Sequence, residues 1–392
     1  MKDIIKAYRY RVYPNKVQRE CLESFFGAKR HIYNYFLALN KELLNNKEYK
    51  LNYKAESALL TALKKELSWL SQADKFSLQN AIKDQDKAFT HFFQKRSGFP
   101  RFKNKKDSYQ SYRTNFTNGN IEIKENKIKL PKIGWVRCVK SREPLGKILN
   151  VTVSQMNEKY YISIACETQI EPKSMPIQSI GIDLGLTSLM VTQTDQGEID
   201  DIANPKWLEK SLKNLKRKQK QLSKKQHSRT KGDTTPKSKS YLKQQKIVAK
   251  IYEKVANQRK DFLHQLSTMI VSENQAIGIE DLHVKGLMKN HKLSRHIAQS
   301  GWRMFREMLE YKAEWHNRTL KVHDRFYPSS RLCTCGVVNK ELVLSDRIWI
   351  CKACGSIHQR DELAANNLIP VEQGEFTPRE CALSGAEEVS NA

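Results

Sequence analysis

The feature that most constrains this chain is a set of four cysteines near its C-terminal end. Cys333 and Cys335 form one close pair, Cys351 and Cys354 form a second, and about fifteen residues separate the pairs. Two short pairs at this separation, each followed by a glycine, are typical of a ribbon that holds one Zn²⁺ ion by four thiolates. Four thiolates leave no position for water, so we expect a structural zinc rather than a catalytic one. Asp361 follows at once, at the start of a predicted helix.

The chain carries a large excess of positive charge. Its 392 residues include 69 lysines and arginines and 42 aspartates and glutamates, a formal net charge of +27 with the histidines neutral. On a chain long enough for two or three domains, this excess favours a nucleic-acid partner, because phosphates offset the self-repulsion. The alternative is a basic protein without catalytic activity, such as a ribosomal accessory factor. Composition alone does not separate DNA from RNA.

No membrane signal is present in the sequence. It contains no run of about eighteen apolar residues, and the first residues, MKDIIKAYRYRVYP, lack the apolar stretch and cleavage site of a signal peptide. We therefore expect a cytoplasmic protein with no membrane partner.

The first half of the chain changes from a β pattern to a helical pattern and back. A strand is predicted in IIKAYRYRVYP, and strands and hairpins are predicted between residues 121 and 166, where apolar and polar residues alternate. The apolar residues that recur at helical spacing between these regions are Leu22, Phe25, Phe26, Ile32, Tyr33, Phe36, Leu37, Leu59, Leu63, Leu67, Ile82, Ala88, Phe89, Phe92 and Phe93. This pattern predicts a small β-barrel with a helical insertion.

The second half has the pattern of a separate α/β domain that begins after the linker EPKSMP. Strands are predicted in SIGIDLG, AIGIEDL and TLKVHDRFY, two long helices between residues 205 and 273, and another helix in WRMFREMLEYKAEW. Beyond Pro370 the residues are small and acidic, so we predict a disordered tail.

Three acidic residues stand at the ends of predicted elements in this half. Asp183 and Glu280 each end a strand, and Asp361 opens the last helix. If the fold brings them together, their oxygens can hold two Mg²⁺ ions about 4 Å apart, which is the arrangement that activates water for phosphodiester hydrolysis. Taken singly, each has a simpler explanation, because an Asp before glycine often forms a turn and an Asp at a helix start often caps it.

Longer strings of sequence favour the catalytic interpretation. GIDLG around Asp183, IGIEDLHVKGLMKNHKLSRHIAQSGW around Glu280, DRFYPSSR before the cysteines and HQRDELAANNL around Asp361 resemble, in this order, the split RuvC nuclease of transposon-encoded TnpB proteins. These proteins are RNA-guided relatives of type V CRISPR effectors. RYRVYPNKVQ, AIKDQDKAFTHFFQ, GFPRFKNKK and IKLPKIGWV resemble the N-terminal half of the family, so the resemblance spans essentially the whole chain.

This resemblance implies an α/β multidomain fold. A β-barrel wedge domain (residues 1–15 and 106–172) would carry a helical recognition domain (16–105). A ribonuclease H-like RuvC nuclease domain (178–325 and 361–370) would follow, with a helical insertion at 205–273 and a zinc ribbon at 326–360. Residues 371–392 would form the disordered tail.

The resemblance also implies an RNA-guided DNA endonuclease of a mobile element. A guide RNA from that element would pair with double-stranded target DNA, and the protein would cut next to a short flanking motif. Asp183, Glu280 and Asp361 would be the catalytic ligands of two Mg²⁺ ions, in a prokaryotic protein that is nucleoid-associated when bound to DNA. A guided DNA-binding repressor that does not cut and a guide-independent transposase or resolvase remain alternatives, and the three intact carboxylates argue against the repressor.

The sequence departs from the family pattern in three places. The pair Cys333 and Cys335 is C-x-C where the family usually has C-x-x-C, His283 stands where Asn often follows EDL, and Leu363 stands where Asn often follows the last Asp by two. The first departure bears on the zinc geometry. None removes a carboxylate, so we expect cleavage to survive, with the orientation of the metal ligands altered at most.

Candidate nucleic-acid contacts are spread over the first half. Basic residues interleave with aromatic ones near residues 99–109, which suits phosphate contact and base stacking, although solvated helix faces would look the same. By resemblance, the helical part reads the flanking motif from side chains that share a helix face. The residues concerned are Tyr53, Ser57, Lys75, Phe76, Gln79, Arg101, Lys103, Thr117 and Asn118. Core packing is the alternative for Phe76.

Overall fold

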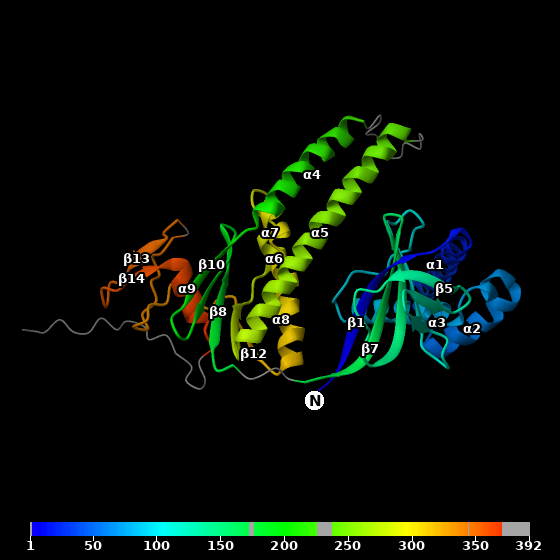
Figure 1. The fold of residues 1–392 in the computed structure, drawn as a ribbon, viewed down its shortest axis with the longest axis horizontal. Coiled ribbons are helices and arrows are strands. Elements are labelled where there is room, and N and C mark those ends of the chain that lie inside the picture. Colours follow the sequence, from blue (N-terminus) through cyan, green and yellow to red (C-terminus); the bar gives the residue numbers. More distant parts are fainter. Residues whose placement is uncertain (1, 172–175, 226–236, 344, 371–392) are drawn as a thin grey trace, which may run out of the picture. The chain divides into compact units, whose positions relative to one another are not determined.

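A computed structural model describes residues 2–171, 176–225, 237–343 and 345–370, and these residues form two compact units (Figure 1). Residues 3–169 make up the first unit, and Lys2 with the residues from 170 onward makes up the second. The tail that we predict to be disordered, residues 371–392, lies outside the described residues. No helix in the described residues is long and apolar enough to cross a membrane.

The first unit is a curled seven-stranded sheet with helices inserted after its first strand (Figure 1). Its strand order is β2-β6-β7-β1-β5-β4-β3. The strands are β1 (Lys2–Tyr13), β2 (Tyr109–Asn115), β3 (Glu122–Lys124), β4 (Lys127–Leu130), β5 (Gly134–Val139), β6 (Lys147–Met156) and β7 (Lys159–Ile170). The inserted helices are α1 (Lys16–Asn45), α2 (Tyr53–Glu66), the 3₁₀ helix η1 (Ser68–Gln72) and α3 (Lys75–Phe93). The predicted sequence of strand, helices and strands is confirmed.

Helix α1 begins where the sequence provides a capping box. The side chain of Asn15 accepts a hydrogen bond from the backbone of Gln18 at 2.9 Å, and the side chain of Gln18 accepts one from the backbone of Asn15 at 3.1 Å. On its buried face, the ring of Phe25 packs edge-on against Tyr112 of β2 with centroids 5.6 Å apart. The helices and the sheet of this unit therefore share one hydrophobic core.

The second unit contains a five-stranded sheet with the order β10-β9-β8-β11-β12. Strands β8 and β12 lie parallel to β11 on either side of it, whereas β9 is antiparallel to both β8 and β10. The strands are β8 (Ser179–Leu184), β9 (Ser188–Thr194), β10 (Ile199–Ala203), β11 (Ala276–Glu280) and β12 (Thr319–His323). The helices are α4 (Lys206–Lys224), α5 (Lys239–Glu273), α6 (Val284–Leu287), α7 (Ser294–Ser300), α8 (Trp302–His316) and α9 (Arg360–Leu368).

Opposite faces of this sheet pack against different helices. Ile182 and Ile279 are fully buried in a core with Leu263 of α5 and Leu309 of α8. Side chains alternate between faces along a strand. The residues directly before and after Ile182 in β8, and directly before and after Ile279 in β11, therefore face the other way, toward α9. Figure 1 shows α9 on one side of the sheet and α5 with α8 on the other.

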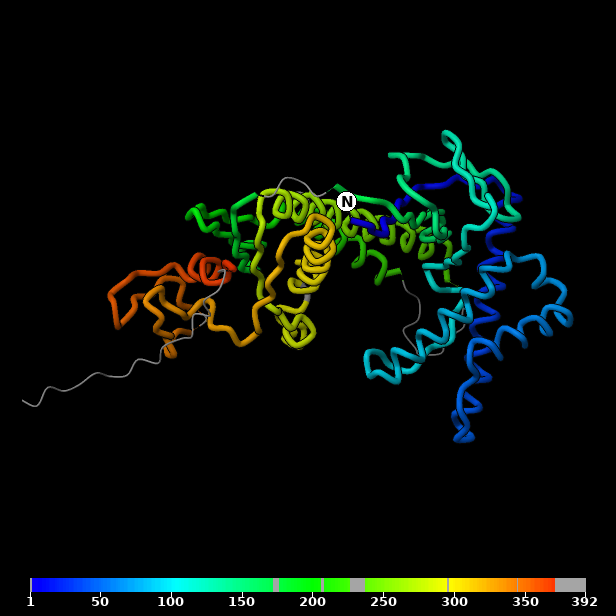
Figure 2. Tube along the Cα trace, turned by 90° about the horizontal axis from the view of Figure 1, so that it is seen from below, coloured from blue at the N-terminus to red at the C-terminus, as the bar shows by residue number. Residues whose placement is uncertain are grey.

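The cysteine-bearing segment lies beside α9. Its strands β13 (Ile348–Ile350) and β14 (Ile357–Gln359) form an antiparallel hairpin that leads directly into the helix. Buried Trp349 shares a small core with two of the cysteines and with Leu363 of α9. Figure 2 shows this segment, in orange, next to α9 in red. The last helix is thus tied to the cysteine segment by packing as well as by the chain.

Candidate active site and cysteine cluster

Asp183 and Glu280 stand side by side at one end of the sheet. They belong to the adjacent parallel strands β8 and β11, in which Ile279 is paired with Ile182. The residues that follow this pair, Glu280 and Asp183, therefore lie at the same edge and on the same face. This face is the one that α9 covers, so the register alone brings two of the three predicted acids together.

Two glycines allow α9 to approach this face. A Cβ on Gly181 would overlap the backbone oxygen of Ala365, and a Cβ on Gly278 would overlap that of Leu368. Each glycine lies two residues before an acid and points to the same face as that acid. The close approach of α9 at these positions brings its first turn, with Asp361, toward the other two carboxylates.

The pKa values of the acids at this end of the sheet reflect burial and an excess of negative charge. Burial, followed by the nearby charges of Glu280 and Asp361, raises the pKa of Asp183 to about 7. Burial, followed by the charge of Asp281, raises the pKa of Glu280. Because like charges and desolvation both oppose ionisation, these shifts indicate carboxylates whose charge the protein does not fully neutralise. Hard cations such as Mg²⁺ prefer oxygen donors of this kind.

Asp361 is held by an arginine that the sequence analysis missed. The Nη1 atom of Arg347 donates to Oδ1 and Oδ2 of Asp361 at 3.1 and 2.9 Å. In the hairpin Ile348 is paired with Gln359, and this register sets Arg347 opposite Arg360 and close to the start of α9. Sequence patterns alone did not indicate this contact, because it depends on the register of the hairpin.

Asp281, next to Glu280, was also missed. Its carboxylate accepts hydrogen bonds from Arg306 of α8 and, at 3.0 Å, from Arg325 after β12. These two arginines lower the pKa of Asp281. Its backbone N–H donates to His323 at 3.0 Å. The residue after Glu280 is therefore anchored to two other elements, which fixes the direction of the strand end.

The four cysteines form the tightest ligand group. Their sulfur atoms all lie within 4.8 Å of one another, with Cys333 3.5 Å from Cys354 and Cys335 3.7 Å from Cys351. A tetrahedron with Zn–S bonds of about 2.3 Å has sulfur–sulfur edges of about 3.8 Å, so the arrangement fits one zinc ion. In the described part of the chain no other group of three or more Cys, His, Asp or Glu ligand atoms is this compact, so the three carboxylates are farther apart.

Both cysteine pairs close through similar turns despite the shorter first pair. Gly336 (φ 89°) donates its N–H to the carbonyl of Cys333, and Gly355 (φ 75°) donates to that of Cys351, each at 2.9 Å. The positive φ angles suit glycine at both positions. The C-x-C departure therefore leaves the sulfur geometry intact. Buried His358 places Nε2 3.0 Å from the sulfur of Cys333 and fixes the hairpin further.

The predicted nucleic-acid contacts all fall in the first unit. Tyr53 and Ser57 lie on α2, and Lys75, Phe76 and Gln79 lie in the first turns of α3. Arg101 and Lys103 are exposed in the loop after α3, and Thr117 and Asn118 are exposed in the turn after β2. Four of the predicted side chains take part in three cation–π contacts within this unit: Tyr53 with Lys83 at 5.2 Å, Phe76 with Lys75 at 4.9 Å, and Lys103 with Tyr33 at 4.7 Å.

Family comparisons match most of the chain in three segments. Residues 161–299 match a family described as "Probable transposase", and residues 302–368 match a domain described as "Cas12f1-like, TNB domain". Residues 1–48 match a family described as a helix-turn-helix domain, although the structure has strand β1 and the single helix α1 there.

Curated relatives cover almost the full length. A protein of Streptomyces pristinaespiralis named "Putative RNA-guided DNA endonuclease" is 38% identical over 376 residues, which cover 94% of this chain and 90% of the relative. The chain belongs to the TnpB family. Escherichia coli InsQ, which has the same descriptive name, is 30% identical to this TnpB-family chain over 385 residues, covering 93% of it and 92% of InsQ.

A solved structure supports the same fold for this TnpB-family protein. The chain of a Cas12f1–sgRNA–target DNA complex matches it with a TM-score of 0.59 and 13% identity, over 93% of this chain and 98% of that one. Because the two chains are only 13% identical, the match shows a similar fold and carries no conclusion about activity.

Proposed function

We propose that this TnpB-family protein is an RNA-guided DNA endonuclease that hydrolyses target DNA with Mg²⁺. The observation that carries the proposal is the position of Asp183 and Glu280 at one end of paired parallel strands, with Asp361 close enough to raise the pKa of Asp183. The names of its full-length relatives point to the same activity. We assign the acids to a RuvC-like nuclease domain formed by residues 178–325 and 361–370.

Asp183, Glu280 and Asp361 would hold two Mg²⁺ ions. The donor set fits, because all the ligand atoms are carboxylate oxygens and their charge is incompletely neutralised. When bound, the ions would supply the positive charge that activates water and stabilises the leaving oxygen. The protein's own contribution is position: the strand register sets Asp183 and Glu280, and Arg347 orients Asp361. A cation at Asp361 would compete with this guanidinium.

The four cysteines would bind one structural Zn²⁺ in a ribbon formed by residues 326–360. The sulfur spacing fits a closed tetrahedral site, which leaves no position for a substrate. Because Leu363 of α9 packs into the same small core as Cys333 and Cys351, zinc would stiffen the support on which Asp361 rests.

The first unit would read the nucleic acids. We assign residues 1–15 and 106–172 to a wedge domain and residues 16–105 to a recognition domain. A guide RNA from the mobile element would pair with double-stranded target DNA, and the flanking motif would be contacted from α2 and α3. The net charge of +27 supports a polyanionic partner. Such a protein would work in the prokaryotic cytoplasm, on the nucleoid.

The cleavage site is tested by Asp183→Ala. In the protein with its guide RNA and a matching DNA duplex, this variant should lose Mg²⁺-dependent cutting while its affinity for the target stays within about twofold of wild type. Removing one ligand of a metal pair eliminates the chemistry but leaves the recognition surface intact. Retained cutting in this variant would refute the assignment of Asp183 to the cleavage site.

Guiding is tested by sequencing the nucleic acid that co-purifies with the protein. One abundant RNA species supports guided cleavage. Its absence would favour a guide-independent transposase or resolvase, and RNA with target binding but no cutting by the wild type would favour a guided repressor.

A further inference from the structure

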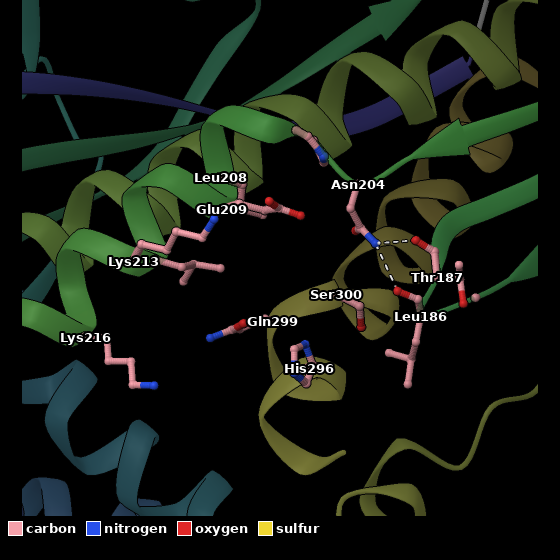
Figure 3. A pocket seen from close by; sticks show the side chains of 13 residues that line it. Leu186, Thr187, Asn204, Leu208, Glu209, Lys213, Lys216, His296, Gln299 and Ser300 are labelled. Carbon is pink, nitrogen blue, oxygen red and sulfur yellow. Dashed lines mark hydrogen bonds between the residues drawn. The ribbon is translucent and has the colours of Figure 1, made fainter. Parts of the chain in front are cut away.

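A cavity of about 540 Å³ opens beside the turn that follows Asp183 (Figure 3). One wall is this turn, residues 185–187 between β8 and β9, and the others are the first half of α4 and the last part of α7. Asn204 fixes the turn, because its amide donates to the carbonyls of Leu186 at 3.1 Å and Thr187 at 3.3 Å. This wall of the cavity is therefore held in place by the protein's own hydrogen bonds, without a ligand, at the end of the sheet where the acids lie.

Its lining combines an apolar wall with cations. Leu208 and Leu212, one turn apart on α4, form the apolar part, and Lys213 and Lys216 lie along the same helix. Neither lysine forms an ion pair among the described residues. Glu209 on the same helix offsets part of this positive charge and offers a hydrogen-bond acceptor.

The side contributed by α7 is polar. Gln299 and His296 line it, and Figure 3 shows them across the cavity from the α4 side chains. The hydroxyl of Ser300 is already used, since it donates to the carbonyl of Ile297 at 2.8 Å. Gln299 provides both a donor and an acceptor, which suits the edge of a nucleobase.

We propose that this cavity receives one unpaired nucleotide of the DNA strand being cut. The volume lies within the range of about 300–1,000 Å³ that is common for small-molecule sites. The base would lie against Leu208 and Leu212 with its edge toward Gln299, and its phosphate would lie toward Lys213 and Lys216. The inference rests on the proposed function, because it requires the strand to pass Asp183.

The apolar wall is tested by comparing two probes in the full-length Asp183→Ala protein, which does not cut them. One probe is a ten-nucleotide thymidine oligomer and the other is an abasic oligomer of the same length and charge, and fluorescence anisotropy gives both dissociation constants. Leu212→Asn should reduce the preference for the thymidine oligomer about five- to tenfold, because it removes apolar area against which the base packs, and should leave abasic binding unchanged. An unchanged preference, or no binding of either probe, would overturn the proposal.

The lysines provide a second measurement that does not depend on the folding of the leucine variant. Exchanging Lys213 and Lys216 for Gln should weaken the binding of both oligomers at least threefold more than exchanging Lys210 and Lys220, which lie on the same helix outside the cavity. Equal losses would show only general attraction and would overturn the proposal. Neither measurement uses a guide or Mg²⁺, so failure of guided cleavage in the wild type refutes the proposed function separately.

Discussion

Gly278→Ala would push the last helix away from the sheet that carries the acids. A Cβ at this position would overlap the backbone oxygen of Leu368, lie 2.8 Å from its carbonyl carbon and lie 3.2 Å from Cδ of Pro370. Two of these neighbours are backbone atoms, so no side-chain rotation relieves the clash. The overlapping oxygen is the closest of these atoms, and non-bonded heavy atoms in contact sit about 3.5 Å apart, so α9 must withdraw by about 1.5–2 Å.

Two effects follow from this displacement. Overpacking of this kind costs about 1–3 kcal/mol of unfolding free energy. Because Asp361 lies at the start of α9, its carboxylate moves relative to Asp183 and Glu280, and a misplacement of about 1 Å can reduce a reaction rate about 100-fold. We therefore expect cutting to fall far more than the affinity for the target.

The assay is single-turnover cleavage of guided target DNA, measured at a temperature at which thermal unfolding shows both proteins folded. Gly98→Ala is the matched control, because its added Cβ meets no atom within 4 Å and should change neither stability nor rate. Gly181→Ala should behave like Gly278→Ala, since its Cβ lies 2.8 Å from the backbone nitrogen of Ile369. Full stability and full activity in Gly278→Ala would refute the packing argument.

Three further results are expected. The pKa of Asp183 is raised to about 7, so the folded protein binds a proton there more tightly than the unfolded chain does, and the resulting free energy of unfolding is lost as the pH rises from about 4 to 7. Without divalent cations, Asp183→Asn should therefore raise the melting temperature at pH 8 more than at pH 5. An equal effect at both pH values would contradict the shift. Asp281→Ala frees the segment after Glu280 and should slow single-turnover cutting about tenfold with target affinity kept, while Asp281→Asn should recover part of the rate; no loss would show that the two arginine contacts are dispensable. Cys351→Ser should abolish stoichiometric zinc in elemental analysis and lower the melting temperature, whereas Cys166→Ser, which is outside the cluster, should keep the zinc; zinc retained in Cys351→Ser would exclude the thiolate site.

Local patterns predicted most of the elements. The helical spacing from Leu22 to Leu37 corresponds to the buried face of α1, and the alternation in AIGIEDL corresponds to β11. These predictions succeed because hydrophobic periodicity is a local property of the chain. The cysteine spacing likewise predicted the sulfur cluster, because both pairs sit on short turns.

Long-range packing was beyond the sequence patterns. Nothing near Gly278 indicates that Leu368, ninety residues later, will lie against it, since the register of β8 and β11 and the path of α9 decide this together. The contact of Arg347 with Asp361 depends in the same way on the hairpin register, which a one-residue slip would reverse. The acids could be singled out from the sequence, but not the residues that position them.

The central claim, RNA-guided cutting, is tested most directly by changing the guide. The protein is reconstituted with its RNA carrying a new guide segment and is incubated with Mg²⁺ and two DNA duplexes that share the flanking sequence, one matching the old guide and one matching the new. We predict that cutting moves entirely to the newly matched duplex. Cutting of both duplexes alike, or of neither under conditions in which the RNA is bound, would contradict the account.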